Sequence, residues 1–172
     1  EGRLKSADHA QQSGSRLPEE STQAGKSIYL LDSSARSPEI TQEKGGGRFQ
    51  PYNKVHTEMM AHAVEQIMTR KRVPPEEIGV IVPFRYSVYQ TKKTLARQGL
   101  RSVEVGTIHT FQGRETRAIL FDTVMSGQST RNGARHFSVR PFDETKNGLS
   151  VPRLLNVAFS RSKEYLVVIA DM

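Results

Sequence analysis

Apolar and polar residues follow one another along this chain in a pattern that predicts alternating strands and helices. Short apolar runs bounded by polar residues are typical of strands, whereas apolar residues that recur at every third or fourth position are typical of helices. Strands are predicted at Ile28–Asp32, Ile78–Val82, Val103–Ile108, Arg117–Val124 and Tyr165–Ala170. Helices are predicted from Asn53 to before Pro74, from Tyr86 to Gln98, and from Ser150–Pro152 to about Lys163.

Local signals support these boundaries and indicate the fold class. Asn53 is a favoured N-cap residue, and Gly99 is a natural stop for the second helix. Strands that alternate with helices predict an α/β fold with a mostly parallel sheet and right-handed crossovers. The run Ile78–Val82 is apolar apart from Gly79, which predicts a sheet covered on both faces.

Polar stretches predict segments outside the sheet. Glu1–Gly25 is rich in Ser, Gln, Glu and Gly and has no apolar period, so we expect a linker or disordered tail at 1–25 and a folded domain at 26–172. Ser33–Pro51 is predicted to be a long mobile loop, and Met125–Gly148 an irregular surface excursion. The chain begins without Met, so we expect it to be a piece of a longer protein.

The charge balance indicates a class of partner. Lys and Arg number 25 against 18 Asp and Glu, and this net charge of +7 favours polyanionic ligands such as nucleic acid or nucleotides. The absence of cysteine excludes a disulfide framework and a thiolate metal site, and it fits an intracellular protein. Because the apolar runs are too short to span a bilayer, no membrane partner is expected.

One polar loop between two apolar strands, Thr107–Glu115, is a candidate ligand site. Loops at the open end of a parallel sheet often carry ligand groups because a crevice lies there. Gly113 permits close backbone approach, and Glu115 offers an acceptor for a ribose hydroxyl. Thr107 and Thr110 offer hydroxyl donors to phosphate oxygens. The alternative is a connecting loop whose polar side chains are merely solvated.

The chain does not contain a phosphate-binding loop. Gly25-Lys26-Ser27 resembles the end of such a loop, but the motif needs a glycine five positions earlier, where Glu20 stands, and a strand before it. We therefore interpret the tripeptide as part of the linker. The three glycines at Gly45–Gly47 have no strand leading into them, and we interpret them as a flexible loop.

Three segments in register resemble the second motor domain of superfamily 1 helicases, in the branch related to the nonsense-mediated-decay helicase. They are Ile78–Arg85, Val105–Asp122 and Pro152–Lys163. The resemblance implies a three-layer, RecA-like fold of the P-loop NTPase type. It also implies that Gly113 and Glu115 face the nucleotide, with Arg85 as a further candidate for phosphate contact. The residues implied to contact nucleic acid are Thr107, Thr110, Asn156 and Ser160.

Arg161 is the residue to which the resemblance gives a catalytic role, as an arginine finger. The planar guanidinium donates two aligned hydrogen bonds and keeps its charge, and such an arginine can be worth ~10³–10⁵ in rate. Taken without the resemblance, Arg161 is better interpreted as a cation that satisfies helix-end carbonyls. The sequence departs from the family pattern at Leu154, Val151, Val82 and His109, where relatives commonly have arginine, an acidic residue, threonine and an acidic residue respectively.

Hydrolysis of ATP also needs a phosphate-binding lysine and an acidic pair that holds Mg²⁺, and this chain has neither. The resemblance therefore implies that ATP and Mg²⁺ are bound mostly by a first RecA-like domain of the same polypeptide. We expect the C-terminal motor domain of an ATP-dependent helicase or translocase that acts on single-stranded DNA or RNA, inactive when isolated, with no metal site of its own. The alternatives are a catalytically dead nucleic-acid-binding domain and an unrelated doubly wound enzyme, such as a small phosphotransferase or nucleotide-binding regulator.

Overall fold

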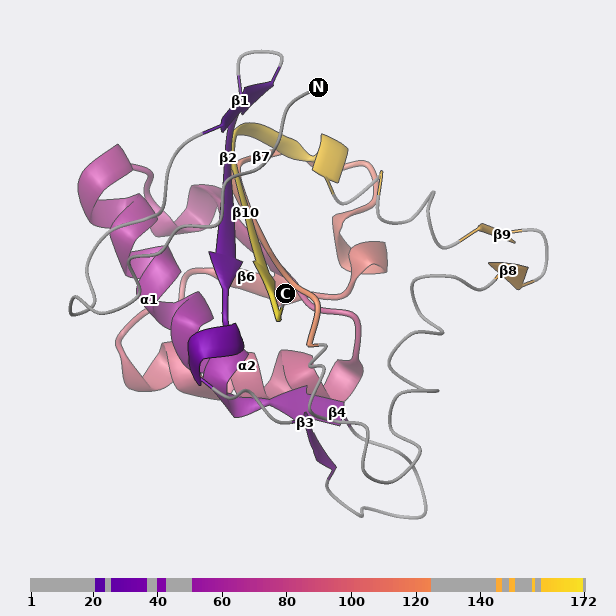
Figure 1. Cartoon of the computed structure of the whole chain (residues 1–172). Coiled ribbons are helices and arrows are strands. Elements are labelled where there is room, and N and C mark those ends of the chain that lie inside the picture. The colour runs from indigo at the N-terminus through magenta and orange to yellow at the C-terminus, as the bar shows by residue number, and fades with distance from the viewer. Residues whose placement is uncertain are drawn as a thin grey trace.

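A six-stranded sheet in the order β1-β2-β10-β7-β5-β6 organises the chain (Figure 1). The computed structural model describes residues 21–23, 26–36, 40–42, 51–124, 145–146, 149–150, 156 and 159–171. The strands of the sheet are β1 (Ser21–Gln23), β2 (Lys26–Asp32), β5 (Ile78–Ile81), β6 (Glu104–Gly106), β7 (Thr116–Asp122) and β10 (Ser162–Ala170). All are parallel to their neighbours except β1, which runs antiparallel to β2. The predicted α/β class with a mostly parallel, RecA-like sheet is confirmed.

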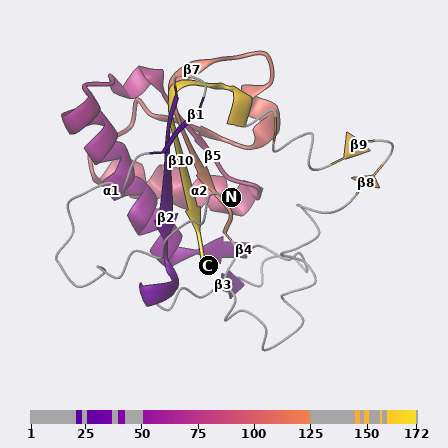
Figure 2. The same cartoon turned by 45° about the horizontal axis from the view of Figure 1, so that its top comes forward.

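Two long helices cover one face of this sheet. They are α1 (Lys54–Lys71) and α2 (Arg85–Arg97), and both lie on the same side of the strands (Figures 1 and 2). Side chains alternate between the faces of a strand, so Ala118 and Leu120 of β7 pack in the cluster that contains Val64 and Leu95 of the helices. None of the described helices is long and apolar enough to cross a membrane.

The opposite face of the sheet carries a second, smaller apolar cluster. Ile119 and Phe121 of β7 point to this face and pack with Phe111 of the short helix η3 (Ile108–Phe111). The ring of Phe159 meets that of Phe121 edge to face, with their centroids 5.4 Å apart. Because both faces of β7 are covered, all its residues from Ala118 to Asp122 are buried.

The predicted helix boundaries at Asn53 and Gly99 are confirmed in detail. The Asn53 side chain accepts a 3.1 Å hydrogen bond from the amide of His56, which is N-capping of α1. Gly99 has a φ of 78°, and the next residue, Leu100, donates its amide to the carbonyl of Leu95 at 2.9 Å. This is the Schellman pattern, in which a glycine takes the left-handed conformation that ends the helix.

Several short elements differ from the prediction. Ser21–Gln23 lies within the predicted tail but forms β1, and the predicted mobile loop contains η1 (Ser34–Arg36) and β3 (Ile40–Gln42), which pairs with β4 (Pro51–Asn53). The remaining described elements are η2 (Pro75–Glu77), β8 (Thr145–Lys146) and β9 (Leu149–Ser150). Most of the predicted tail, surface excursion and third helix lies outside the described residues. Phe159 and Ser160 are helical, but β10 already begins at Ser162, so the prediction of a helix to Lys163 was wrong at its end.

Candidate functional site

The candidate loop crosses the sheet from one end to the other. β6 finishes at Gly106, at the end of the sheet where the parallel strands terminate, here called the carboxyl end. β7 starts at Thr116, at the opposite, amino end. Between them η3 lies on the sheet with Phe111 fully buried, and the carbonyl of Thr107 accepts a 2.9 Å hydrogen bond from the amide of Thr110. The loop therefore presents residues at both ends of the sheet.

Two glycines that were not predicted to matter allow η3 to lie so close to the sheet. A Cβ at Gly106 would lie 2.5 Å from Oγ1 of Thr110, and a Cβ at Gly79 would lie 2.6 Å from Cε1 of Phe111. Real Cβ atoms essentially never approach other atoms this closely. Gly79 interrupts the otherwise apolar β5, a pattern that indicates close approach of another segment and that sequence reasoning could have used, whereas Gly106 is the last residue of β6.

Gly113 and Glu115 lie at the amino end of the sheet. Gly113 has a φ of 77° and open space where a Cβ would stand, so its conformation rather than crowding requires glycine. Between them, Arg114 donates a 2.6 Å hydrogen bond to Glu104 at the start of β6, and Glu115 lies 3.8 Å from the ammonium of Lys163. The loop is therefore not confined to one open end of the sheet, because the path from one parallel strand to the next must return to the amino end.

Arg161 lies beside Gly113 and Glu115. It occupies the turn before β10, and its carbonyl accepts a 3.0 Å hydrogen bond from the amide of Thr116, the residue that follows Glu115. Its side chain is half-buried, and within the described part of the chain its buried Nε has no hydrogen-bond partner. A buried donor without an acceptor is costly, so this guanidinium fits an anionic ligand. Arg161 follows the helical residues Phe159 and Ser160 and lies outside the helix.

The candidate residues thus fall into two groups. Gly113, Glu115 and Arg161 lie together at the amino end, whereas Thr107 and Arg85 directly follow the ends of β6 and β5 at the carboxyl end. The seven residues of β7 separate the two groups, which corresponds to roughly 23 Å at ~3.3 Å per residue. Arg85 was predicted to contact the nucleotide with Gly113 and Glu115, but the structure does not bring it near them.

The remaining candidates are all exposed. Thr110 packs its side chain over Gly106, near Thr107. Ser160 precedes Arg161 at the amino end and so lies apart from Thr107, with which it was grouped. Asn156 is helical and exposed. Within the described ranges, no three His, Asp or Glu side chains gather in a group that could hold a metal ion.

An ion-pair network connects the two strands that follow Glu115 and Arg161. Arg117 of β7 donates to both carboxylate oxygens of Glu164 on β10, at 2.8 and 2.9 Å, and to Glu77 at 3.3 Å. The hydrogen bonds from Arg117 lower the pKa of Glu164, and those to Glu164 raise the pKa of Arg117. These side chains are partly exposed, so the network orients the strands more than it stabilises the fold.

A buried polar network at the carboxyl end was not predicted. Nδ1 of His56 lies 2.7 Å from Oδ1 of Asp122, and Nε2 of His56 lies 2.8 Å from Oγ of Ser33. Serine, histidine and carboxylate at this spacing occur in hydrolases. Here, however, Ser33 and His56 are 0% exposed and Asp122 is 1% exposed, so a substrate has no access. The network instead ties the end of β2 to the start of α1 and the end of β7.

Comparison with known proteins gives consistent matches. The model of the family described as AAA domain matches residues 1–172. Human "RNA helicase Mov10l1" is 27% identical over 150 residues, which cover 85% of this chain and 11% of the human protein. "Regulator of nonsense transcripts 1 homolog" of Neurospora crassa is 34% identical over 117 residues, 63% of this chain and 9% of that protein. Mouse "DNA replication ATP-dependent helicase/nuclease DNA2" is 32% identical over 98 residues, 57% of this chain and 8% of that protein.

These matches agree with the three sequence segments and with the observed fold. The chain spans only about a tenth of the length of these relatives. Their names nevertheless all describe helicases or a regulator of nonsense transcripts, and the family match covers the whole chain. The chain therefore belongs to the AAA domain family and is a superfamily 1 helicase-like domain with a RecA-like fold.

Proposed function

We propose that this chain is the C-terminal motor domain of an ATP-dependent superfamily 1 helicase or translocase. In this proposal it supplies an arginine finger and part of the nucleic-acid groove. The observation that carries the proposal is the position of Arg161 beside Gly113 and Glu115, held there by the hydrogen bond between its carbonyl and the Thr116 amide. The helicase names of longer relatives support the same reading.

At the amino end of the sheet the residues suit a nucleotide. Arg161 has an unpaired donor for a phosphate oxygen, Gly113 leaves room for close backbone approach, and the exposed carboxylate of Glu115 can accept a ribose hydroxyl. ATP, held with Mg²⁺ mostly by a first RecA-like domain, supplies the phosphoanhydride bond. The fixed charge of Arg161 neutralises charge that develops on the transferred phosphoryl group, which is the main way in which proteins accelerate this reaction.

At the carboxyl end the residues suit the backbone of single-stranded DNA or RNA. Thr107 and Thr110 offer hydroxyl donors, and the net charge of +7 attracts polyanions. Contacts of this kind are independent of base sequence and weaken as salt rises. β7 runs from the nucleotide end of the sheet to the end proposed to bind nucleic acid. In this proposal, movement at the nucleotide end is transmitted along β7 to the nucleic-acid contacts.

The test is ATP turnover by the longer protein that contains this domain. Arg161→Ala should lower turnover by ~10²–10⁴ while ATP affinity changes much less. Arg161→Lys should restore little, because an ammonium lacks the paired donors. The matched control is Arg114→Ala, which removes a positive charge from the same end of the sheet but from a side chain already paired with Glu104. Normal turnover in Arg161→Ala would instead favour a nucleic-acid-binding domain without a catalytic role.

A further inference from the structure

The outer face of α2 is entirely cationic around one exposed aromatic side chain. The helix contains no acidic residue, and its exposed residues include Arg85, Lys92, Lys93 and Arg97. None of these four cations makes an ion pair within the part of the chain that the structure describes. Tyr89 lies among them with 58% of its surface exposed, and only one other large apolar side chain in the described residues is comparably exposed. Such a face suits a polyanion that also carries flat apolar groups.

The helical spacing arranges these residues in a row. Arg85, Tyr89, Lys92 and Ala96 are separated by four, three and four positions, so they lie on one side of α2, opposite the buried Ser87. The row extends roughly 16 Å at ~1.5 Å per residue. It begins where β5 ends, next to the strand that leads into Thr107.

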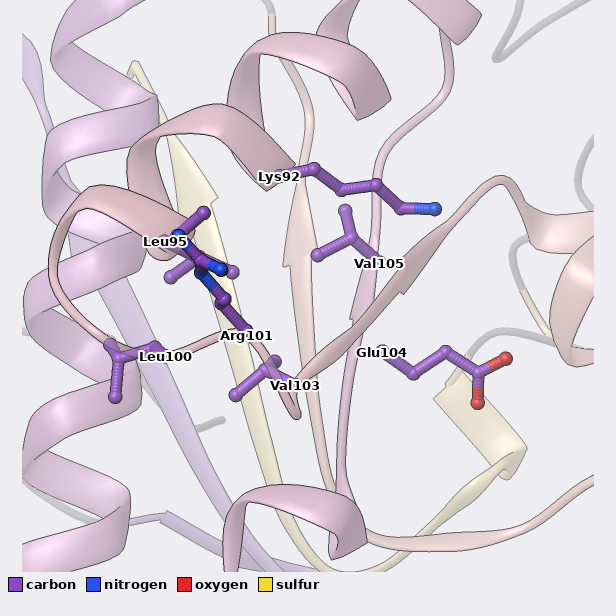
Figure 3. Close-up of a pocket in the computed structure, with 8 residues that line it drawn as sticks. Lys92, Leu95, Leu100, Arg101, Val103, Glu104 and Val105 are labelled. Atoms are coloured by element: carbon purple, nitrogen blue, oxygen red, sulfur yellow. The ribbon is translucent and has the colours of Figure 1, made fainter.

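At its far end the row reaches a pocket of about 300 Å³ between α2 and β6. Figure 3 shows the lining side chains, which come from the helix, from the turn after it and from the strand. Lys92 and Arg101 bring positive charge to the lining, and Glu104, which pairs with Arg114, brings a carboxylate. The rest of the lining is apolar and includes Leu100, Val103 and Val105. The row is therefore continuous with a pocket that can receive an apolar group beside two cations and one carboxylate that is already paired.

Neighbouring side chains hold the Tyr89 ring in place. The ring of Tyr86 lies 6.3 Å from that of Tyr89, tilted by 32°, and meets the ring of Tyr52 edge to face at 6.2 Å. The hydroxyl of Tyr86 accepts a hydrogen bond from Gln90. The Tyr89 ring is thus exposed and lies against the Tyr86 ring, which restricts its motion. Little conformational entropy is therefore lost when a planar group stacks on Tyr89.

We propose that this face of α2 binds single-stranded nucleic acid, with one base stacked on Tyr89 and the flanking phosphates held by Arg85 and Lys92. This inference rests on the proposed function, because it assumes the same ligand, single-stranded nucleic acid. It adds a second contact with that ligand, outside the Thr107–Thr110 loop. Arg85 lies too far from Gly113 and Glu115 to contact the nucleotide together with them. The proposal gives Arg85 a role in nucleic-acid binding instead. Stacking explains why an aromatic ring, rather than another cation, stands exposed at the centre of the row.

The experiment measures binding of the protein to fluorescein-labelled oligothymidylate and oligouridylate by anisotropy. Tyr89→Ala should raise the Kd by about 5- to 100-fold, the equivalent of ~1–3 kcal/mol for one stacked base, and Tyr89→Phe should keep wild-type affinity. Lys92→Gln should reduce the slope of log affinity against log salt by about 0.7, the value for one phosphate contact on a single strand. Lys54→Gln, which removes an exposed cation of α1 that lies near Glu58, should leave the slope unchanged.

Stacking itself has a direct readout because the chain contains no tryptophan. In Tyr89→Trp the only indole should be quenched when either oligonucleotide binds, whereas Leu30→Trp, at the other exposed apolar position, should not be. Unchanged affinity in Tyr89→Ala, no quenching in Tyr89→Trp, or equal competition by polyglutamate would each overturn the proposal. If affinity then fell in Thr107→Val instead, the proposed function would stand without this second contact. If the protein bound neither oligonucleotide, the α2 site would be refuted, and the Arg161 turnover test would still decide the proposed function separately.

Discussion

Nδ1 of His56 and Oδ1 of Asp122 lie 2.7 Å apart in the interior, although the two residues are 66 positions apart in the sequence. The contact joins the first turn of α1 to the last residue of β7, and Asp122 also accepts a 2.7 Å hydrogen bond from the amide of Val124. Val124 has a φ of 60°, an unfavourable conformation for a β-branched residue, so this carboxylate holds a strained turn in place. Both partners have lost contact with water and depend on each other for their hydrogen bonds.

Removing one partner of this pair should therefore destabilise the protein markedly. Asp122→Ala should lower the free energy of unfolding by about 3 kcal/mol, because it leaves His56 and the Val124 amide without an acceptor. Glu58→Ala removes an exposed carboxylate of α1 that is paired with Lys54, and it should change stability by no more than about 0.5 kcal/mol. Denaturant titrations of both variants provide the comparison, and equal stabilities would contradict the assigned role of the network.

The close approach of η3 to the sheet makes Gly106 sensitive to a single methyl group. Gly106→Ala should cost about 1–3 kcal/mol, because its Cβ would overlap the Thr110 side chain. Thr110→Gly in the same protein removes the overlapping atoms, so the double variant should be more stable than the sum of the two single changes predicts, by about 0.5–3 kcal/mol. Simple additivity in thermal or chemical denaturation would mean that the loop moves away at little cost.

The Arg117–Glu164 pair should make a small, pH-dependent contribution to stability. Arg117 lowers the pKa of Glu164 from its ordinary value of 4.5 in the folded protein. The contribution is therefore fully present above pH 4.5, the ordinary value, and is lost as the pH falls through the lowered pKa of the folded state. The melting temperature of Glu164→Gln should lie below that of the wild type at neutral pH, and the gap should close in acid. Glu76→Gln, an exposed control in η2, should show no such convergence, and a gap that widened in acid would refute the assignment.

The purified chain should not hydrolyse ATP in the presence of Mg²⁺. Its sequence has Glu20 where a phosphate-binding loop needs glycine, and its proposed contribution to hydrolysis is confined to Arg161, Gly113 and Glu115. A coupled-enzyme turnover assay on the wild type and Arg161→Ala is sufficient. Steady Mg²⁺-dependent turnover that disappears in the variant would favour a self-contained phosphotransferase over half of a bipartite site.

The features predicted correctly from the sequence were those that depend on neighbouring residues. The N-cap at Asn53, the helix stop at Gly99 and the apolar strands follow from local chemistry, so their boundaries were found within a few residues. The features that were missed depend on contacts across the fold. The β6–β7 loop reaches both ends of the sheet because Phe111 is buried against β5, and His56 finds Asp122 only after the sheet has formed. Short strands such as β1 are stabilised by their partners rather than by their own pattern.

The position of β10 has a consequence for how the protein is made. β10 is the last of the described strands in the sequence, yet it lies between β2 and β7 and pairs with both. Until β10 is synthesised, the pair β1–β2 is not hydrogen-bonded to the strands β7, β5 and β6. The edges of β2 and β7 that pair with β10 then have no partner strand. Contacts such as Val167 with Tyr29 must then form over most of the chain length, which slows folding. A nascent chain paused before Ser162 therefore exposes the edges at which pairing with another unfinished copy is easiest.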